Sequence, residues 1–192
     1  MEIETIFGLP AHPLIVHIPV VLIPLCALGA VLMAFSPAWR HRIGWIVVVL
    51  AGVAVGASQL SVGSGEALEE ALDDESELLE RHAELGETFS WVALVFFLAV
   101  LALMIWDTMQ RRRAAAAEEP FDAKRVSRSP LGIVLSIVVV LTAVGAGYRV
   151  YEVGHSGAEA VWQDDGGTPD GTPSEGGEHE GEDEEGATAL RP

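Results

Sequence analysis

Apolar residues in this chain gather into four long blocks instead of being spread through the sequence. The blocks cover residues 14–35, 43–62, 89–106 and 131–150, and a helix needs ~20 residues to cross the hydrocarbon core of a bilayer. Runs such as residues 46–50 do not alternate between polar and apolar positions, which argues against the strands of a membrane β-barrel. The pattern therefore predicts an all-α membrane protein, a bundle of four transmembrane helices.

The segments outside the blocks are strongly polar, and the 192-residue chain has a formal net charge of -17 although half of it is hydrophobic. We expect one four-span membrane domain over residues 1–162. The tail over residues 163–192 is rich in Gly, Pro, Thr, Glu and Asp and has too little apolar surface to offset its ordering entropy, so it is expected to be disordered.

The acidic loop between the second and third blocks, residues 65–85, contains leucines at near-helical spacing at positions 68, 72 and 79. This spacing predicts a helical loop. Two arrangements fit the pattern: a short helix packed against the bundle, or a solvated extension of the third span.

The positive charges of the chain indicate its orientation in the membrane. The loops after the first and third blocks contain Arg40, Arg42, Arg111, Arg112, Arg113, Lys124, Arg125 and Arg128. Short loops rich in Arg and Lys stay cytoplasmic. We therefore expect a multi-pass protein with both termini and the acidic loop on the extracytoplasmic side.

Four histidines are the main candidates for chemistry, because ionisable residues in or near a span are costly and often functional. They are His12, His17, His82 and His155, and the expected topology places all of them at the outer ends of the first, third and fourth spans. Imidazole ligates haem iron, copper and zinc. The alternative is that each ring only hydrogen-bonds to backbone or lipid headgroups.

Neighbouring polar residues extend this candidate site. His12 and His17 lie about 140° apart around one helix unless a proline kink, as expected at Pro19 and Pro24, re-aims them. Ser58, Gln59, Ser61 and Ser64 of the second span could hydrogen-bond toward His17. Arg149 could pair with Glu152, with a lipid phosphate or with a cofactor carboxylate. Tyr148, Tyr151 and His155 are expected to share one helix face.

The sequence favours no enzyme class. It contains no P-loop, nucleotide-binding glycine fingerprint or HExxH pattern. The basic residues form only short loops, so nucleic-acid binding is not expected either.

Three motifs resemble a bacterial membrane-protein family catalogued as domain of unknown function 2231. They are His12-Pro13-x-x-x-His17-x-Pro19, Arg81-His82-x-x-x-Gly86 and Gly154-His155-Ser156-Gly157-Ala158, and the resemblance covers roughly Gly8 to Trp162. It implies about four spans in the bacterial cytoplasmic (inner) membrane. Because some members are fused to cytochrome c or Rieske-type modules, it also implies respiratory or cytochrome-type redox partners.

Three hypotheses follow from the residues and the resemblance together. The first is a haem-b-binding or electron-transfer membrane subunit with His17 and either His82 or His155 as axial ligands. The second is a non-catalytic scaffold or interaction subunit in which the histidines are structural. The third is a metal-binding or metal-sensing protein that uses His17, His82 and His155 as ligands.

Overall fold

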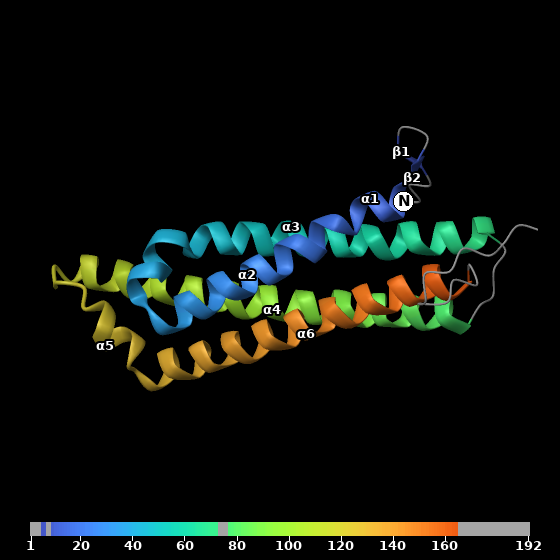
Figure 1. Ribbon diagram of the computed structural model, residues 1–192. Coiled ribbons are helices and arrows are strands. Elements are labelled where there is room, and N and C mark those ends of the chain that lie inside the picture. Colours follow the sequence, from blue (N-terminus) through green and yellow to red (C-terminus); the bar gives the residue numbers. More distant parts are fainter. Residues whose placement is uncertain (1–4, 7–8, 73–76, 165–192) are drawn as a thin grey trace, which may run out of the picture.

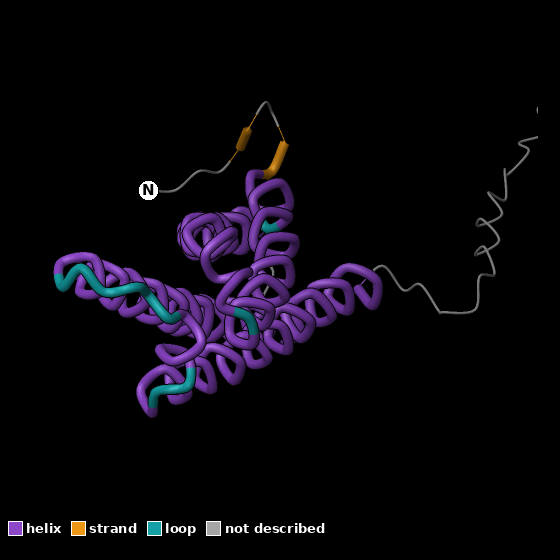
Figure 2. Tube along the Cα trace, turned by 90° about the vertical axis from the view of Figure 1, so that its left-hand side faces the viewer, coloured by secondary structure: helices purple, strands orange, loops and turns teal. Residues whose placement is uncertain are grey.

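The computed structural model describes residues 5–6, 9–72 and 77–164 (Figure 1). In chain order the elements are β1 (Thr5–Ile6), β2 (Leu9–Pro10), α1 (Ala11–Ile15), α2 (His17–Phe35), α3 (Pro37–Leu72), α4 (Glu77–Ala116), α5 (Ala123–Ser127) and α6 (Pro130–Asp164). The two short strands pair antiparallel, with Thr5 opposite Pro10. They lie at the periphery of the molecule beside the start of α1 (Figure 2).

The four long helices form one bundle. α2 packs against α3 and α6, and α4 packs against the same two helices, so α2 and α4 lie diagonally across the bundle from each other. Four helical stretches are long and apolar enough to cross a membrane: Ala11–Phe35, Pro37–Ala67, Glu77–Ala116 and Pro130–Glu159. The predicted fold class, an all-α membrane protein with four spans, is confirmed.

The bundle buries large and small apolar side chains together. Ile23 and Phe96 have no exposed surface, and neither do Ala51 and Ala54, which let α3 approach its neighbours. Large apolar side chains also cover the outside of the bundle, among them Val21, Leu28, Val49 and Leu141. An apolar exterior of this kind suits a helix bundle surrounded by lipid.

The glycines of α3 contribute less to helix packing than their spacing predicts. A Cβ atom added to Gly52 would make an ordinary contact with Phe97, and one added to Gly56 would meet no atom within 4 Å. The close approach expected from small residues at i and i+4 is therefore not made at Gly56.

The turn between α2 and α3 is much shorter than the sequence suggested. Only Ser36 separates the helices, and Pro37 follows as the first residue of α3, where its missing N–H costs no helical hydrogen bond. The prediction that Arg40 and Arg42 lie in a loop is wrong, because both belong to the first two turns of α3.

α3 and α4 extend beyond their apolar blocks. The described parts of the acidic loop are helical and continue these two helices. Residues 73–76 and the tail from residue 165 lie outside the described residues. The packed loop helix and the disordered tail therefore stay predictions, although α6 itself runs to Asp164.

A helix break lies near the start of the first span. Pro19 has no N–H to donate to the carbonyl of Ile15, and α1 ends at Ile15, with α2 beginning at His17. This break separates His12 on α1 from His17 on α2. The directions of the two side chains are therefore not set by the geometry of a single continuous helix.

Candidate functional site

Two imidazole rings from different helices meet at one end of the bundle, which we call the histidine end. His12 lies on α1 and His82 on α4, and both are half-buried. Their ring centroids are 6.2 Å apart, with the planes 86° from parallel. Because α1 leads into α2, and α2 lies diagonally from α4, the rings meet across the bundle.

The His12 ring is anchored to α3 through one nitrogen. Its Nδ1 lies 2.9 Å from the carbonyl oxygen of Ser61 and 3.4 Å from Oγ of Ser64. The Ser64 hydroxyl donates its own hydrogen to the same Ser61 carbonyl, at 3.1 Å. A carbonyl oxygen can only accept, so Nδ1 of His12 carries the hydrogen.

The His82 ring is anchored to α6 by the same kind of contact. Its Nδ1 lies 2.9 Å from Oγ of Ser156. The Ser156 hydroxyl donates to the carbonyl oxygen of Val153 at 3.0 Å, so the hydroxyl oxygen accepts from His82. In this ring, too, Nδ1 carries the hydrogen.

These anchors set the tautomer of both neutral rings. With Nδ1 protonated, Nε2 of each imidazole presents a lone pair. The contacts of His12 with Ser61 and Ser64, and that of His82 with Ser156, use Nδ1. Metal-ligating histidines are typically held in this way, with one ring nitrogen donating to the protein and the other binding the metal.

Glycines allow each ring to lie against the backbone of its partner helix. A Cβ atom at Gly65 would be 3.1 Å from Cε1 of His12, and one at Gly157 would be 2.9 Å from Cε1 of His82. Each glycine follows an anchoring serine, and these are the two Ser-Gly dipeptides of the chain. The bundle thus builds the same arrangement twice, once between α1 and α3 and once between α4 and α6. The repeated dipeptide marks both places in the sequence, but it does not show which histidine packs there.

The structure does not bring the other two predicted histidines into this pair. His17 is exposed, and its Nδ1 contacts the carbonyl oxygen of Pro13 one turn earlier. His155 is exposed on α6, where it stacks on Tyr151 at 5.9 Å and lies 3.4 Å from a carboxylate oxygen of Glu159. Of the four polar residues of α3 that were expected to reach toward His17, Ser61 and Ser64 contact His12 instead.

Arg149 is paired within its own helix. Its Nη1 lies 3.0 Å from Oε2 of Glu152, which is one of the partners expected from the sequence. The stacking of Tyr151 on His155 confirms that these two rings share a face. That face points outward, because Tyr148 and Tyr151 are mostly exposed. The pairing of Arg149 with a cofactor carboxylate stays a prediction.

Sequence reasoning missed a buried ion pair at the opposite end of the bundle, which we call the arginine end. Arg40 has no exposed surface and Asp107 only 2 %, and Nη1 of Arg40 lies 3.7 Å from Oδ1 of Asp107. The Arg40 guanidinium also donates to the carbonyl of Met33 at 3.1 and 3.2 Å and to the hydroxyls of Ser127 and Ser136. One side chain of α3 is thereby tied to α2, α4, α5 and α6.

Asp107 has a second basic partner, since Nε of Arg111 donates to its Oδ2 at 2.7 Å. From the sequence, Arg40 and Arg111 were predicted to be charged residues of cytoplasmic loops. Asp107 lies just outside the third apolar block. The signal for this site was an acid directly after an apolar block with a basic residue four positions later. That signal alone does not identify Arg40 as the buried partner.

A comparison with protein families gives one match, over residues 8–170, to a family described as a predicted membrane protein, DUF2231. The matched range includes both the histidine pair and the buried ion pair. No curated protein and no solved structure matches the chain.

Proposed function

The chain belongs to the DUF2231 family of predicted membrane proteins, and from that premise we propose that it is a haem-binding membrane subunit with His12 and His82 as axial ligands. The proposal retains the haem hypothesis but changes the ligands. His12 replaces His17, which is exposed. His155 is excluded from the ligand pair because it stacks on Tyr151 at the outer surface.

The number of available ligands favours haem over a free metal ion. Within the described part of the chain, no group of three or more His, Cys, Asp or Glu side chains could hold a metal. Zinc sites take three or four protein ligands. Haem iron takes only its axial ligands from the protein, so two imidazoles are sufficient.

The spacing of the rings supports the same proposal. A bond from a metal to an imidazole nitrogen is about 2 Å long, so two imidazoles on opposite sides of one ion have centroids roughly 6 Å apart. The observed separation is 6.2 Å. The rings also come from diagonal helices of the bundle, and cofactor sites in bundles are built from side chains on facing helices.

The residues around the rings suit a ligand role. Ser61 and Ser156 hold the Nδ1 atoms, which orients each ring and leaves Nε2 for the iron. If His12 and His82 both hold the haem iron, the bound group would supply electron transfer. Under the positive-inside orientation, this site faces the extracytoplasmic side, where a cytochrome-type partner could exchange electrons with it.

The proposal is tested by spectroscopy of the full-length protein, expressed with sufficient haem and purified in a mild detergent. We expect a reduced-minus-oxidised spectrum with the bands of a bis-imidazole b-type haem, in an amount stoichiometric with the chain. His12→Asn and His82→Asn should abolish the bands. The matched controls, His17→Asn and His155→Asn, should retain them. A wild-type protein without Soret or α bands would rule the proposal out.

Asparagine is chosen because its amide nitrogen can take the place of Nδ1. His12→Asn can therefore still donate to the Ser61 carbonyl, whereas His12→Ala cannot. Loss of haem in both variants, with a loss of stability in the alanine variant only, would separate the ligand role from the anchoring role.

A scaffold function is the second candidate, and the observation in its favour is that both Nδ1 anchors join neighbouring helices. If the rings serve only as cross-links, the purified protein contains neither haem nor metal by elemental analysis. In that case His82→Ala lowers stability and His82→Asn does not.

A further inference from the structure

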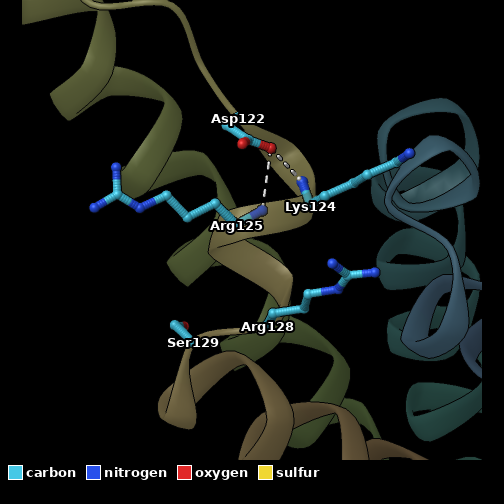
Figure 3. A pocket seen from close by; sticks show the side chains of 5 residues that line it. All are labelled: Asp122, Lys124, Arg125, Arg128 and Ser129. Atoms are coloured by element: carbon cyan, nitrogen blue, oxygen red, sulfur yellow. Dashed lines mark hydrogen bonds between the residues drawn. The ribbon is translucent and has the colours of Figure 1, made fainter.

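A cavity of about 590 Å³ lies at the arginine end, away from the histidine pair. It is lined by Asp122, Lys124, Arg125, Arg128 and Ser129 (Figure 3). These residues belong to α5 and the segments that flank it, between the end of α4 and the start of α6. From the charges, anchoring and position of this cavity we infer that it binds the phosphate group of an anionic phospholipid.

The three cations of the cavity are available for an external anion. Lys124, Arg125 and Arg128 are exposed, and no described acidic side chain forms an ion pair with any of them. The one acid in the lining, Asp122, accepts hydrogen bonds from the backbone N–H groups of Lys124 and Arg125 at 3.0 and 3.1 Å. Lys124 and Arg128, one helical turn apart, extend to the same side of α5, whereas Arg125 extends to the other side (Figure 3).

The short helix that presents these cations is held firmly by the bundle. A Cβ atom at Gly132 of α6 would be 2.7 Å from the carbonyl oxygen of Val126 and 2.8 Å from the Trp106 ring, so the start of α6 lies directly against both α5 and α4. Nη1 of Arg40 donates to the hydroxyl of Ser127 at 3.3 Å, which ties α5 to α3 as well. A cation cluster on an anchored helix loses little conformational freedom when an anion binds.

The position of the cavity favours a lipid over a soluble phosphate compound. The apolar stretch of α6 begins at Pro130, directly after the lining residue Ser129, and Leu131 and Val134 are more than half exposed. The cations therefore lie where an apolar helix surface begins, at the depth of lipid headgroups. Basic pockets at the ends of transmembrane helices bind anionic headgroups in this way.

The test is native mass spectrometry of the full-length protein in a neutral detergent, titrated with phosphatidylglycerol or with phosphatidylcholine. We expect phosphatidylglycerol to bind and phosphatidylcholine to bind far more weakly. Lys124→Gln and Arg128→Gln should each weaken phosphatidylglycerol binding by roughly fivefold, and Arg125→Gln should weaken it less, because Arg125 extends to the other side of α5. The matched control for the triple variant is Arg42→Gln with Arg112→Gln and Arg113→Gln, which removes the same charge from exposed residues that do not line the cavity.

Three results would overturn the inference. One is equal weakening by the cavity triple variant and the control triple variant, which would reflect net charge alone. Another is unchanged binding in the cavity variant. The third is displacement of bound phosphatidylglycerol by millimolar inorganic phosphate, which would assign the cavity to a soluble phosphate compound. The haem spectrum is a separate readout, so its absence would not affect this result.

Discussion

At the histidine end, the polar groups inside the bundle are half-buried imidazole rings, whereas at the arginine end they are an arginine and an aspartate almost without exposed surface. Each ring is anchored through one nitrogen, and its tautomer leaves the other nitrogen with a lone pair. Arg40 instead forms an ion pair with Asp107 and donates hydrogen bonds to a backbone carbonyl and two serine hydroxyls.

This difference separates the proposed binding site from a buried ion pair that holds helices together. A buried charge costs several kcal/mol unless a partner compensates it, so Arg40 and Asp107 hold the surrounding helices in one arrangement. A neutral imidazole with a spare acceptor has a smaller desolvation cost and can still take a ligand. The three predictions that follow test this contrast, from the largest expected effect to the smallest.

The largest effect is expected at the arginine end. Asp107→Leu leaves the fully buried Arg40 without its anion and should lower the free energy of unfolding by about 3–5 kcal/mol. Arg40→Met should cost less, because Asp107 keeps Arg111 at 2.7 Å. Unfolding in mixed micelles with increasing SDS measures both changes. A cost of Arg40→Met equal to that of Asp107→Leu would contradict the view that Arg111 can compensate Asp107.

A smaller effect is expected from the backbone beneath the His82 ring. Gly157→Ala places a Cβ 2.9 Å from Cε1 of His82, so the ring must shift, at a cost of about 1–3 kcal/mol. Gly154→Ala, three residues earlier on α6, meets no atom within 4 Å. This control should be neutral or stabilising by up to about 1 kcal/mol, because alanine favours the helix. The same unfolding assay compares the two variants, and equal effects would show that the ring tolerates displacement.

The smallest effect is expected at Arg149, whose partner Glu152 lies one turn away on the same helix and is partly exposed. Arg149→Gln should lower the free energy of unfolding by only about 0.2–0.5 kcal/mol, as for other helix-surface pairs. The matched control is Arg149→Lys, which retains the positive charge and should be close to neutral in the same assay. A loss of haem in the glutamine variant and not in the lysine variant would reveal a cofactor carboxylate as a further partner of this cation.

The sequence predicted the spans well and the connections poorly. Blocks of apolar residues are read directly from composition, because a helix in lipid must be apolar along its length. The one-residue turn at Ser36 and the position of Arg40 inside α3 could not be predicted in this way, because they depend on how the helices pack. A basic residue after an apolar block has the same appearance whether its side chain faces water or Asp107.

The sequence predicted that four histidines lie at one end of the bundle. It did not predict which two of them form a pair or which residues hold them. Topology placed His12 and His82 at a common depth, and the structure brings those two rings together. Topology could not distinguish His12 from His17, because the direction in which each ring points depends on the break between α1 and α2 near Pro19. The anchors Ser61 and Ser156 are identified only when α3 and α6 are placed beside their histidines.

The sequence by itself determined that the chain forms four apolar helices, because lipid requires each span to be apolar and to satisfy its own backbone hydrogen bonds. Only the tertiary structure decided which polar side chains share the interior, since that choice depends on how the helices rotate and pack against one another. The pairing of His12 with His82, and of Arg40 with Asp107, joins residues that are 70 and 67 positions apart. Contacts between residues so far apart in the sequence cannot be predicted from a local pattern of residues.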